Sequence, residues 1–209
     1  MYKYFFKRLI DFCIASVILL LLSPLLLVIT IWLHFVNKGA GAFFCQPRPG
    51  KNEKIFKIIK YKSMTDEKDE NGNLLPDVQR LTAVGRFIRA TSIDELPQFF
   101  NVLKGDMALI GPRPLLIEYL PYYTDRERLR HSVRPGITGY TQVHGRNNLP
   151  WDTRLEMDVF YVEHLSFFCD IKIVLRTIIN VITHKDVQVI TGDQKTSKLS
   201  QQRQLDNLS

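Results

Sequence analysis

One uninterrupted apolar segment near the N-terminus constrains the fold more than any other feature of this 209-residue chain. Between Asp11 and Lys38 the sequence contains no Asp, Glu, Lys or Arg. A helix rises about 1.5 Å per residue, so a straight helix of this length would cross the roughly 30 Å hydrocarbon core of a bilayer. Because the remaining sequence is polar and basic, the segment predicts a globular domain held at a membrane.

A proline near the middle of the apolar segment argues against a straight helix. Pro24 has no N–H to donate to the carbonyl of Leu20, and its ring pushes against that turn, so a kink is expected. The hydroxyl of Ser23 is expected to bond back to the carbonyl of Leu19 and to deepen the bend. The Ser23-Pro24 pair therefore predicts a break in the membrane helix.

Basic residues flank the apolar segment on both sides: Lys3, Lys7 and Arg8 before it, and Lys38, Arg48, Lys51, Lys54 and Lys57 after it. The positive-inside rule favours a cytoplasmic location for both flanks. A re-entrant helix that enters and leaves by the same face satisfies the charge pattern and the kink, although an ordinary spanning helix fits the physics about equally well. A signal peptide cleaved at Ala40-Gly41-Ala42 fits worst, because the segment exceeds the roughly 7–15 apolar residues of such a peptide.

The composition narrows the class of protein. The chain has 28 basic and 21 acidic residues, a formal charge of +7, which suits nucleic acid, an anionic membrane surface or a phosphorylated substrate. With 45% hydrophobic residues it is neither disordered, collagen-like nor polytopic. Its three widely spaced cysteines define no disulfide framework or zinc site, which indicates a reducing compartment. The length predicts one domain.

The globular part is expected to be an α/β domain, mostly helical with short strands. Strands are expected at 55–64 and 107–110, a loop at 65–77, helical structure over 115–130 with a break at Pro121, and a glycine-rich connection at 134–150. On strand 55–64, Lys60 lies on the same face as Phe56 and Ile58. An amphipathic helix is expected at 170–184, capped by Asp170, and it suits either the core or a membrane interface.

Two adjacent carboxylates lie where a helix is expected to begin, within residues 92–105. Ser92 and Glu95 have the spacing of a capping box, whereas Pro97 prefers the first helical position, with Gly105 ending the helix. Either start places Asp94 and Glu95 near a helix N-terminus. Capping and complementation of the helix dipole explain both residues without any catalytic function.

The motifs of several common enzymes are absent. The sequence has no P-loop, Rossmann glycine motif, HExxH, CxxC, DxD or GxSxG. It does hold Arg113 between two prolines, in a rigid turn suited to a bidentate phosphate contact. Carboxylates surrounded by cations are compatible with metal-assisted phosphoryl transfer, a weak hypothesis from spacing alone.

An ordered series of motifs gives the chain a specific resemblance. They are Ser23-Pro24, QPRPGKNEKIFKIIKYKSM (46–64), SIDELPQFFNVLKGDMALIGPRPLLIEYLP (92–121), RPGITGYTQVHGRN (134–147) and LSFFCDIKIVL (165–175). Over nearly its full length the chain resembles the small monotopic phosphoglycosyl transferases of bacteria. It departs from the usual pattern at Tyr140-Thr141, where Leu-Ala is common, a difference that bears on sugar choice.

The resemblance implies a membrane enzyme at the cytoplasmic face of the bacterial inner membrane, anchored by a re-entrant helix broken at Ser23-Pro24. It implies a UDP-sugar donor, expected to be an N-acetylated hexosamine such as UDP-N,N′-diacetylbacillosamine. The other implied partners are undecaprenyl phosphate as acceptor, Mg²⁺, membrane lipids and later glycosyltransferases of the pathway, with no nucleic acid. The reaction would release UMP in the first membrane step of glycoconjugate synthesis, by a ping-pong mechanism.

Residue roles follow from the same resemblance. Asp94 would be the nucleophile that carries the phosphosugar, and a Mg²⁺ ligand. Glu95 would assist proton transfer or orient the site. The phosphates and the donor would be bound by five basic residues: Lys60, Arg89, Arg113, Arg134 and Arg146.

The implied organisation is a basic flank with a re-entrant helix (1–38), a cytoplasmic catalytic domain with interfacial amphipathic helices (39–192) and a disordered tail (193–209). One alternative is a membrane-anchored basic adaptor that binds anionic lipid without catalysis. Such an adaptor would bind in a strongly salt-dependent manner and be indifferent to Asp94. A catalytically silent member of the family is a further alternative, against which the intact Asp94-Glu95 pair argues.

Overall fold

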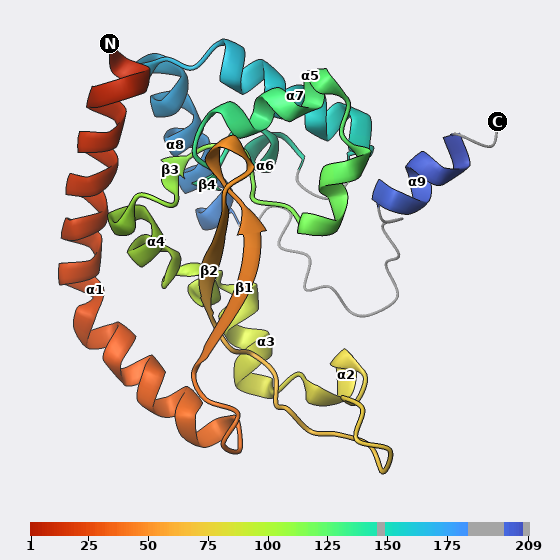
Figure 1. Ribbon diagram of the computed structural model, residues 1–209. Coiled ribbons are helices and arrows are strands. Elements are labelled where there is room, and N and C mark those ends of the chain that lie inside the picture. Colours follow the sequence, from red (N-terminus) through yellow and green to blue (C-terminus); the bar gives the residue numbers. More distant parts are fainter. Residues whose placement is uncertain (146–148, 184–198, 207–209) are drawn as a thin grey trace.

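A long bent helix, α1 (Lys7–Val36), runs along one side of the computed structural model, which describes residues 1–145, 149–183 and 199–206 (Figure 1). A π-helical turn, η1 (Tyr2–Phe6), precedes it. Of the helices described, α1 together with this turn is long and apolar enough to cross a membrane, with a mean hydropathy of 2.9 over its most apolar stretch. The mostly helical architecture with short strands and an N-terminal apolar helix is the one expected.

The helix continues through Pro24 and changes direction near its middle (Figure 1). The Ser23 hydroxyl donates to the carbonyl of Leu20 at 2.8 Å. The prediction that the Leu19 carbonyl is the acceptor is therefore wrong. The physical reason is that Pro24 has no N–H for the Leu20 carbonyl, and the neighbouring hydroxyl takes that place.

Both halves of α1 pack against the domain. In the first half, buried residues recur every four positions, at Lys7, Asp11, Ala15 and Leu19. The second half buries Ile29 and Leu33 in a cluster with three residues of the domain, Ala42, Tyr61 and Ile88. The remaining apolar side chains of the helix are largely exposed. One face of α1 therefore packs against the domain, and the other is an exposed apolar surface.

An antiparallel hairpin forms the larger strand pair. Strand β1 (Phe43–Pro49) pairs with β2 (Ile55–Tyr61), from Phe43 opposite Tyr61 to Pro49 opposite Ile55, and a 3₁₀ turn, η2 (Lys51–Glu53), lies between them. The strand expected at 55–64 is confirmed over 55–61. Its partner was not predicted, because prolines are rare inside sheets, but in a two-stranded ribbon both strands are edges.

The second pair is parallel and very short. Strand β3 (Ala108–Ile110), within the expected strand at 107–110, pairs with β4 (Gly136–Thr138). The backbones approach so closely that a Cβ on Gly136 would lie 2.1 Å from the amide nitrogen of Gly111. The glycines of the 134–150 segment thus permit a strand that was expected to be only a connection.

Short helical elements fill the space between the strands and the C-terminus. They are α2 (Asp77–Arg80), α3 (Ala83–Ala90), η3 (Ile93–Glu95), α4 (Gln98–Lys104), η4 (Ile117–Tyr122), α5 (Asp125–Arg128), η5 (Leu129–Ser132), α6 (Tyr140–His144) and α7 (Trp151–Glu163). The helical segment expected at 115–130 is broken, but Pro121 lies inside η4 and the break follows it. There, Thr124 begins α5 with a capping box to Glu127.

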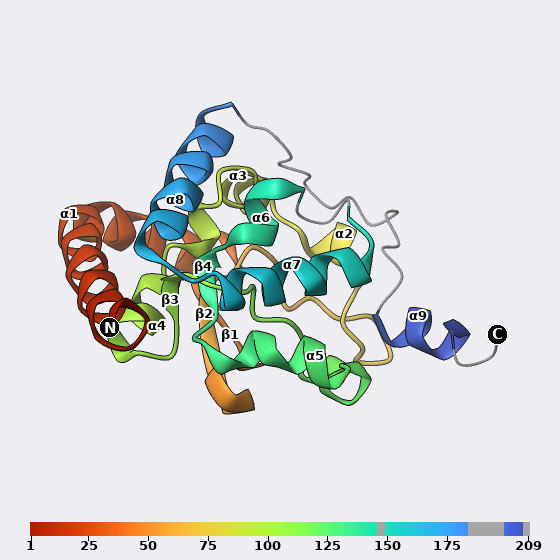
Figure 2. The same ribbon diagram turned by 90° about the horizontal axis from the view of Figure 1, so that it is seen from above.

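Helix α8 (Phe167–Ile182) begins earlier than expected. Its N-cap is Ser166, whose hydroxyl accepts from the amide of Cys169. The expectation that Asp170 caps the helix is therefore wrong. Asp170 is buried and accepts hydrogen bonds from Tyr2, Lys7 and Tyr161, at 2.6, 2.7 and 2.8 Å. The N-terminal ends of α1 and α8 are joined by these contacts, and both helices lie toward one side of the molecule (Figure 2).

The final described element is α9 (Leu199–Asp206). Leu199 is fully buried in a cluster with Tyr119, Tyr123, Trp151 and Leu155. Where a disordered tail was expected, the structure describes a helix over residues 199–206, whose Leu199 is buried and whose Arg203 forms ion pairs with Glu127 and Asp152. Residues 184–198 and 207–209, including the expected boundary at 192, lie outside the described residues.

Candidate active site

The Asp94-Glu95 pair lies on the 3₁₀ turn η3, between α3 and α4. Ser92 adopts a left-handed conformation (φ 56°) and its side chain caps nothing, so the capping-box prediction is wrong. Helix α4 instead starts at Gln98, with Pro97 as its N-cap, one position earlier than the first helical position predicted for the proline; it ends at Gly105 in the left-handed conformation (φ 89°), as predicted. The two carboxylates precede the helix rather than belonging to it, which leaves their side chains free to face a cleft.

Glu95 is held by two cations. The Lys60 ammonium lies 2.7 Å from Oε1 of Glu95, and the Arg113 guanidinium lies 3.1 Å from the same oxygen. Burial alone would raise the pKa of Glu95, but the charges of Arg113 and Lys60 outweigh it and lower the pKa to about 2. Glu95 is therefore ionised throughout the physiological pH range.

Asp94 has the opposite environment. It forms no hydrogen bond or ion pair with other residues that the structure describes. Burial, and then the negative charge of Glu95, raise the pKa of Asp94 to about 6, against the weaker effects of Lys60, Arg89 and Arg113. Adjacent carboxylates whose pKa values move apart are typical of sites with divided chemical roles.

Arg89, on α3, lies on the Asp94 side of the pair. Its Nε donates to the Ser63 hydroxyl at 2.8 Å. This contact depends on close packing of α3, because a Cβ on Gly85 would lie 1.9 Å from the Ser63 carbonyl oxygen. Arg89 forms no ion pair with a carboxylate among the described residues, so its charge is available to an anion in the cleft.

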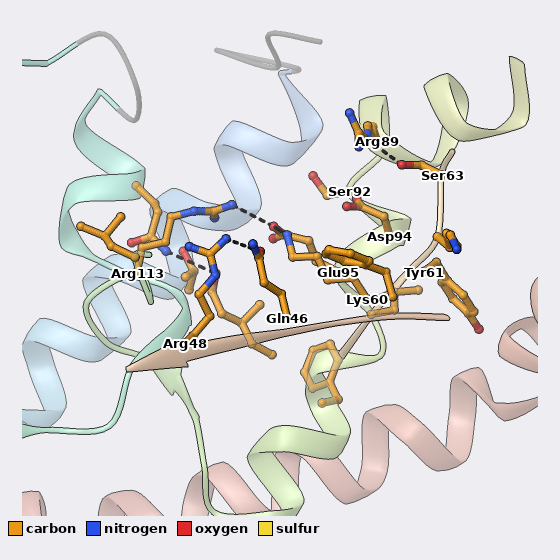
Figure 3. Close-up of a pocket in the computed structure, with 18 of the residues that line it drawn as sticks. Gln46, Arg48, Lys60, Tyr61, Ser63, Arg89, Ser92, Asp94, Glu95 and Arg113 are labelled. Atoms are coloured by element: carbon orange, nitrogen blue, oxygen red, sulfur yellow. Dashed lines mark hydrogen bonds and ion pairs between the residues drawn. The ribbon is translucent and has the colours of Figure 1, made fainter. Parts of the chain in front are cut away.

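These residues line one open cleft of about 890 Å³. Figure 3 shows the acidic pair in its middle, with Arg89 and Ser63 toward one end and Arg48, Gln46 and Arg113 toward the other. Of the predicted site residues, the structure brings Asp94, Glu95, Lys60, Arg89 and Arg113 together here. The cleft thus has a cationic group on each side of a carboxylate pair, an arrangement that suits two phosphate-bearing ligands.

Two of the predicted cations are not placed there. Arg134 donates to the carbonyl of Gly105 at 2.7 Å and does not line the cleft. It stabilises the end of α4 instead. Arg146 lies outside the described residues.

Sequence reasoning missed two arginines of the cleft. Arg48, on β1, donates to Gln46 at 2.6 Å, and burial and the charge of Arg113 lower its pKa. Arg154, on α7, lies 4.1 Å from the centre of the Trp151 ring, and burial lowers its pKa. Lowered pKa values in buried arginines indicate cations crowded together, which an anion would relieve. The Gln-Pro-Arg series was a signal for Arg48, whereas nothing in the pattern singled out Arg154.

Thr141, at the position where the chain departs from the usual pattern, also lines the cleft. Its hydroxyl donates to Asp158 at 2.6 Å, and Asp158 forms a buried ion pair with Arg130 at 2.7 Å. The departure therefore adds a hydrogen bond to a buried charge pair that borders the ligand space.

The residues present fit a loosely held Mg²⁺. The described residues contain no group of three or more His, Cys, Asp or Glu that could form a cage. Mg²⁺ commonly binds one or two carboxylates and completes its coordination with water and substrate phosphates. Asp94, unpaired and central in the cleft, is the carboxylate available for such a site.

The fold and site define a class: a domain with an apolar anchor helix and a cleft built for phosphate chemistry. Comparison with known proteins agrees, since residues 2–184 match the bacterial sugar transferase family, to which the chain therefore belongs. A Bacillus subtilis protein named uncharacterized sugar transferase EpsL is 49% identical over 182 residues, covering 87% of this chain and 90% of that protein.

Other relatives carry functional names. The undecaprenyl-phosphate galactose phosphotransferase of Salmonella typhimurium is 39% identical over 190 residues. An N-acetylgalactosaminephosphotransferase of Aeromonas hydrophila, which by its name uses UDP-N-acetylgalactosamine and undecaprenyl phosphate, is 41% identical over 188 residues. The chain covers 40% and 44% of these two proteins, so it corresponds to less than half of each. The names support a transferase that acts between UDP-sugars and undecaprenyl phosphate.

Proposed function

We propose that this protein transfers a sugar 1-phosphate from a UDP-sugar to undecaprenyl phosphate and releases UMP. The observation that carries the proposal is the unpaired carboxylate of Asp94, with its raised pKa, beside the ion-paired Glu95, between Arg89 on one side and Arg48 and Arg113 on the other. The names of the relatives support the same reaction class.

In the first step, a carboxylate oxygen of Asp94 attacks the phosphorus that bears the sugar. The bond between this phosphorus and the bridging oxygen breaks, and UMP leaves with the electron pair. The products are UMP and a phosphosugar joined to the Asp94 carboxylate as an acyl phosphate. An anionic nucleophile and an anionic diphosphate repel each other, so the cations of Arg48, Arg113 and Arg154 are needed to offset the charge.

In the second step, an oxygen of the lipid phosphate attacks the same phosphorus. The bond to Asp94 breaks, the carboxylate is restored and a polyprenyl diphosphate sugar is formed. Arg89 would bind the lipid phosphate, because it lies near Asp94 and on the opposite side from Arg48 and Arg113 (Figure 3). Two steps at one carboxylate let UMP leave before the lipid reacts.

Glu95 is assigned an orienting role. A carboxylate with a pKa of about 2 is a weak base, so proton transfer is not its best use. By accepting from Lys60 and Arg113 together, it fixes two cations beside the reacting phosphate. Mg²⁺ bound by Asp94 and the donor phosphates would neutralise charge on the leaving UMP.

The membrane arrangement is proposed to be monotopic, with a re-entrant α1 and the domain on the cytoplasmic face. The support is that Arg8, before the bend, donates to the Leu103 carbonyl, whereas Leu26, after it, accepts from the Tyr61 hydroxyl, each at 2.8 Å. Both halves of α1 thus contact one domain. A straight crossing would take one half away from it.

The donor is proposed to be a UDP-N-acetylated hexosamine, the sugar class named for the Aeromonas relative, and UDP-N,N′-diacetylbacillosamine belongs to the same class. Selectivity among such sugars depends on a few hydrogen bonds in the cleft. Later glycosyltransferases of the pathway would use the product.

The test is UMP release from a panel of UDP-sugars with Mg²⁺, with and without undecaprenyl phosphate. The panel contains UDP-glucose, UDP-galactose, UDP-N-acetylgalactosamine, UDP-N-acetylglucosamine and UDP-N,N′-diacetylbacillosamine. Lipid-dependent UMP release from an N-acetylated donor is expected, with a sub-stoichiometric burst when lipid is omitted. Release only from UDP-glucose or UDP-galactose would contradict the sugar assignment. Salt-dependent lipid binding with no UMP from any donor would favour the adaptor instead.

A further inference from the structure

The cleft that holds Asp94 extends to the second half of α8. Thr177 and Val181 of that helix line it, and Ser63 and Arg89 line the same cleft. Thr177 is half-buried, and its hydroxyl lies 2.8 Å from that of Thr138 on β4, which fixes this wall of the cleft. The carboxylate pair and an apolar helix therefore share one continuous space.

Val181 links this space to the outer surface. A helix turns by about 100° per residue, which places Val181 between Thr177, on the cleft wall, and Ile178, on the outer face. The outer face consists of exposed apolar side chains: Ile171, Val174, Leu175, Ile178, Ile179 and Ile182. Val181 itself is 53% exposed. The apolar surface of α8 thus reaches the edge of the cleft without a charged residue between.

Arg89 gives the same cleft a cationic group. Arg89 has its Nε on Ser63, and no carboxylate of the described chain neutralises it. A ligand matching both this cation and the apolar helix must carry an anionic group at one end and an apolar chain at the other. A polyprenyl phosphate has that form, whereas a UDP-sugar has no apolar part to place on Val181.

We infer that Val181 and Thr177 form the rim over which the isoprenoid chain of the acceptor enters the cleft, with its phosphate directed to Arg89. The inference rests on the proposed function and assigns a positioning role to a helix outside the catalytic pair. It differs from simple membrane contact because only the cleft-lining side of α8 takes part. The outer face of the same helix is left to the bilayer.

The experiment compares Val181→Asn with Ile179→Asn in nanodiscs containing undecaprenyl phosphate. Both changes remove an exposed β-branched apolar side chain from the same helix, at 53% and 56% exposure, but Ile179 does not line the cleft. Initial rates are measured against acceptor at saturating donor, and against donor at saturating acceptor. Neither substitution alters the net charge, so the field at Asp94 is retained.

The expected result is an acceptor KM about tenfold higher in Val181→Asn, as for loss of a valine-sized apolar contact, with the donor KM unchanged. In Ile179→Asn, the acceptor KM and the donor KM should both equal those of the wild type. Equal acceptor KM values in the two variants, or a rise in donor KM equal to the rise in acceptor KM, would overturn the rim assignment. A wild-type protein that transfers no sugar phosphate would instead overturn the proposed function, so the two failures are distinguishable.

Discussion

At the scale of single residues, two adjacent carboxylates are made chemically different by their partners. Glu95 has two cations within 3.1 Å, whereas Asp94 has no ion pair among the described residues. One group is therefore a permanent anion that orients cations. The other has no ion-pair partner, which leaves its oxygens available for the nucleophilic role proposed for it.

The pH dependence of kcat/KM should report the pKa of Asp94. Since only the ionised carboxylate is nucleophilic, activity should fall as the pH is lowered through about 6. Glu95→Gln removes the neighbouring negative charge and should move this acidic limb to lower pH, whatever it does to the maximal rate. Rates measured from pH 4.5 to 8 in both proteins test this. If the acidic limb of the pH profile lies at the same pH in Glu95→Gln as in the wild type, Glu95 does not influence the titrating group.

The same pKa has a consequence for folding. The pKa of Asp94 is raised in the folded protein above its ordinary value of 3.8, so the ionised form is disfavoured by folding. Above about pH 6, where Asp94 is ionised in the folded and the unfolded protein, it lowers the free energy of unfolding by its full amount. Below about pH 4, where it is protonated in both states, this effect disappears. We expect Asp94→Asn to unfold at a higher temperature than the wild type at pH 8 and at a similar temperature at pH 4. Lower stability of the variant at pH 8 would contradict the account.

The residues of the site were only partly predictable. Asp94, Glu95, Lys60, Arg89 and Arg113 follow from motif resemblance, and the structure gathers them. The opposite directions of the pKa shifts of Asp94 and Glu95 did not follow, since they depend on distances to side chains from β2 and the proline-bounded turn. Arg134 does not line the cleft, because a loop arginine in a matching motif can equally well bond a backbone carbonyl, here that of Gly105.

At the scale of elements, the bend of α1 is the feature on which the membrane topology depends. The Ser23 hydroxyl occupies the carbonyl that Pro24 leaves without a partner, and the Tyr61 hydroxyl donates to the Leu26 carbonyl beyond the bend. The bend is thus stabilised from within the helix and from the domain.

Replacing the proline should change that topology. Pro24→Ala restores an N–H for the Leu20 carbonyl and favours a straight helix. Cysteine-bearing tags at both ends, in a chain with Cys13, Cys45 and Cys169 replaced by serine, should be labelled from the same side in the parent protein. A substantial fraction of Pro24→Ala should have its ends on opposite sides. Ser23→Ala keeps the proline and should retain the parent topology; opposite-side labelling of the parent would contradict the re-entrant proposal.

Elements with a clear periodic pattern were predictable, and those set by tertiary contacts were not. The apolar helix, the strand at β2 and the helix at α8 follow from hydrophobic spacing. Strand β1 contains two prolines, and β4 needs glycines for close backbone approach, so both contradict local propensity. Helix α9 is held by the buried Leu199 and by ion pairs of Arg203 with Glu127 and Asp152, contacts that composition alone does not reveal.

At the scale of the whole molecule, Asp170 connects elements far apart in sequence. It accepts from Tyr2 and Lys7 at the N-terminus and from Tyr161 on α7. Since Asp170 is itself on α8, one buried carboxylate ties the start of the anchor helix to the second apolar helix. The pairing fixes the two apolar helices relative to each other, as the proposed monotopic arrangement requires.

Removing this carboxylate should destabilise the protein strongly. Asp170→Ala removes the 2.7 Å partner of the buried Lys7 and leaves it only the Asp11 carboxylate at 4.0 Å, and about 3–5 kcal/mol of unfolding free energy is typical for breaking a buried pair. Lys172→Ala, at an exposed position on the same helix, should change it by less than about 0.5 kcal/mol. Chemical unfolding in detergent measures both. Similar unfolding midpoints for the two variants would show that the buried network does not join the helices.

The most direct test of the central claim is the mass of the intact protein after incubation with the active UDP-sugar and Mg²⁺, without acceptor. We expect the wild type to gain the mass of one sugar phosphate and to lose it when undecaprenyl phosphate is added. Asp94→Asn should fold, enter membranes and gain nothing, whereas Asp106→Asn, outside the cleft, should gain the adduct. An adduct on Asp94→Asn with its asparagine intact, or near-normal turnover by that variant, would contradict the account.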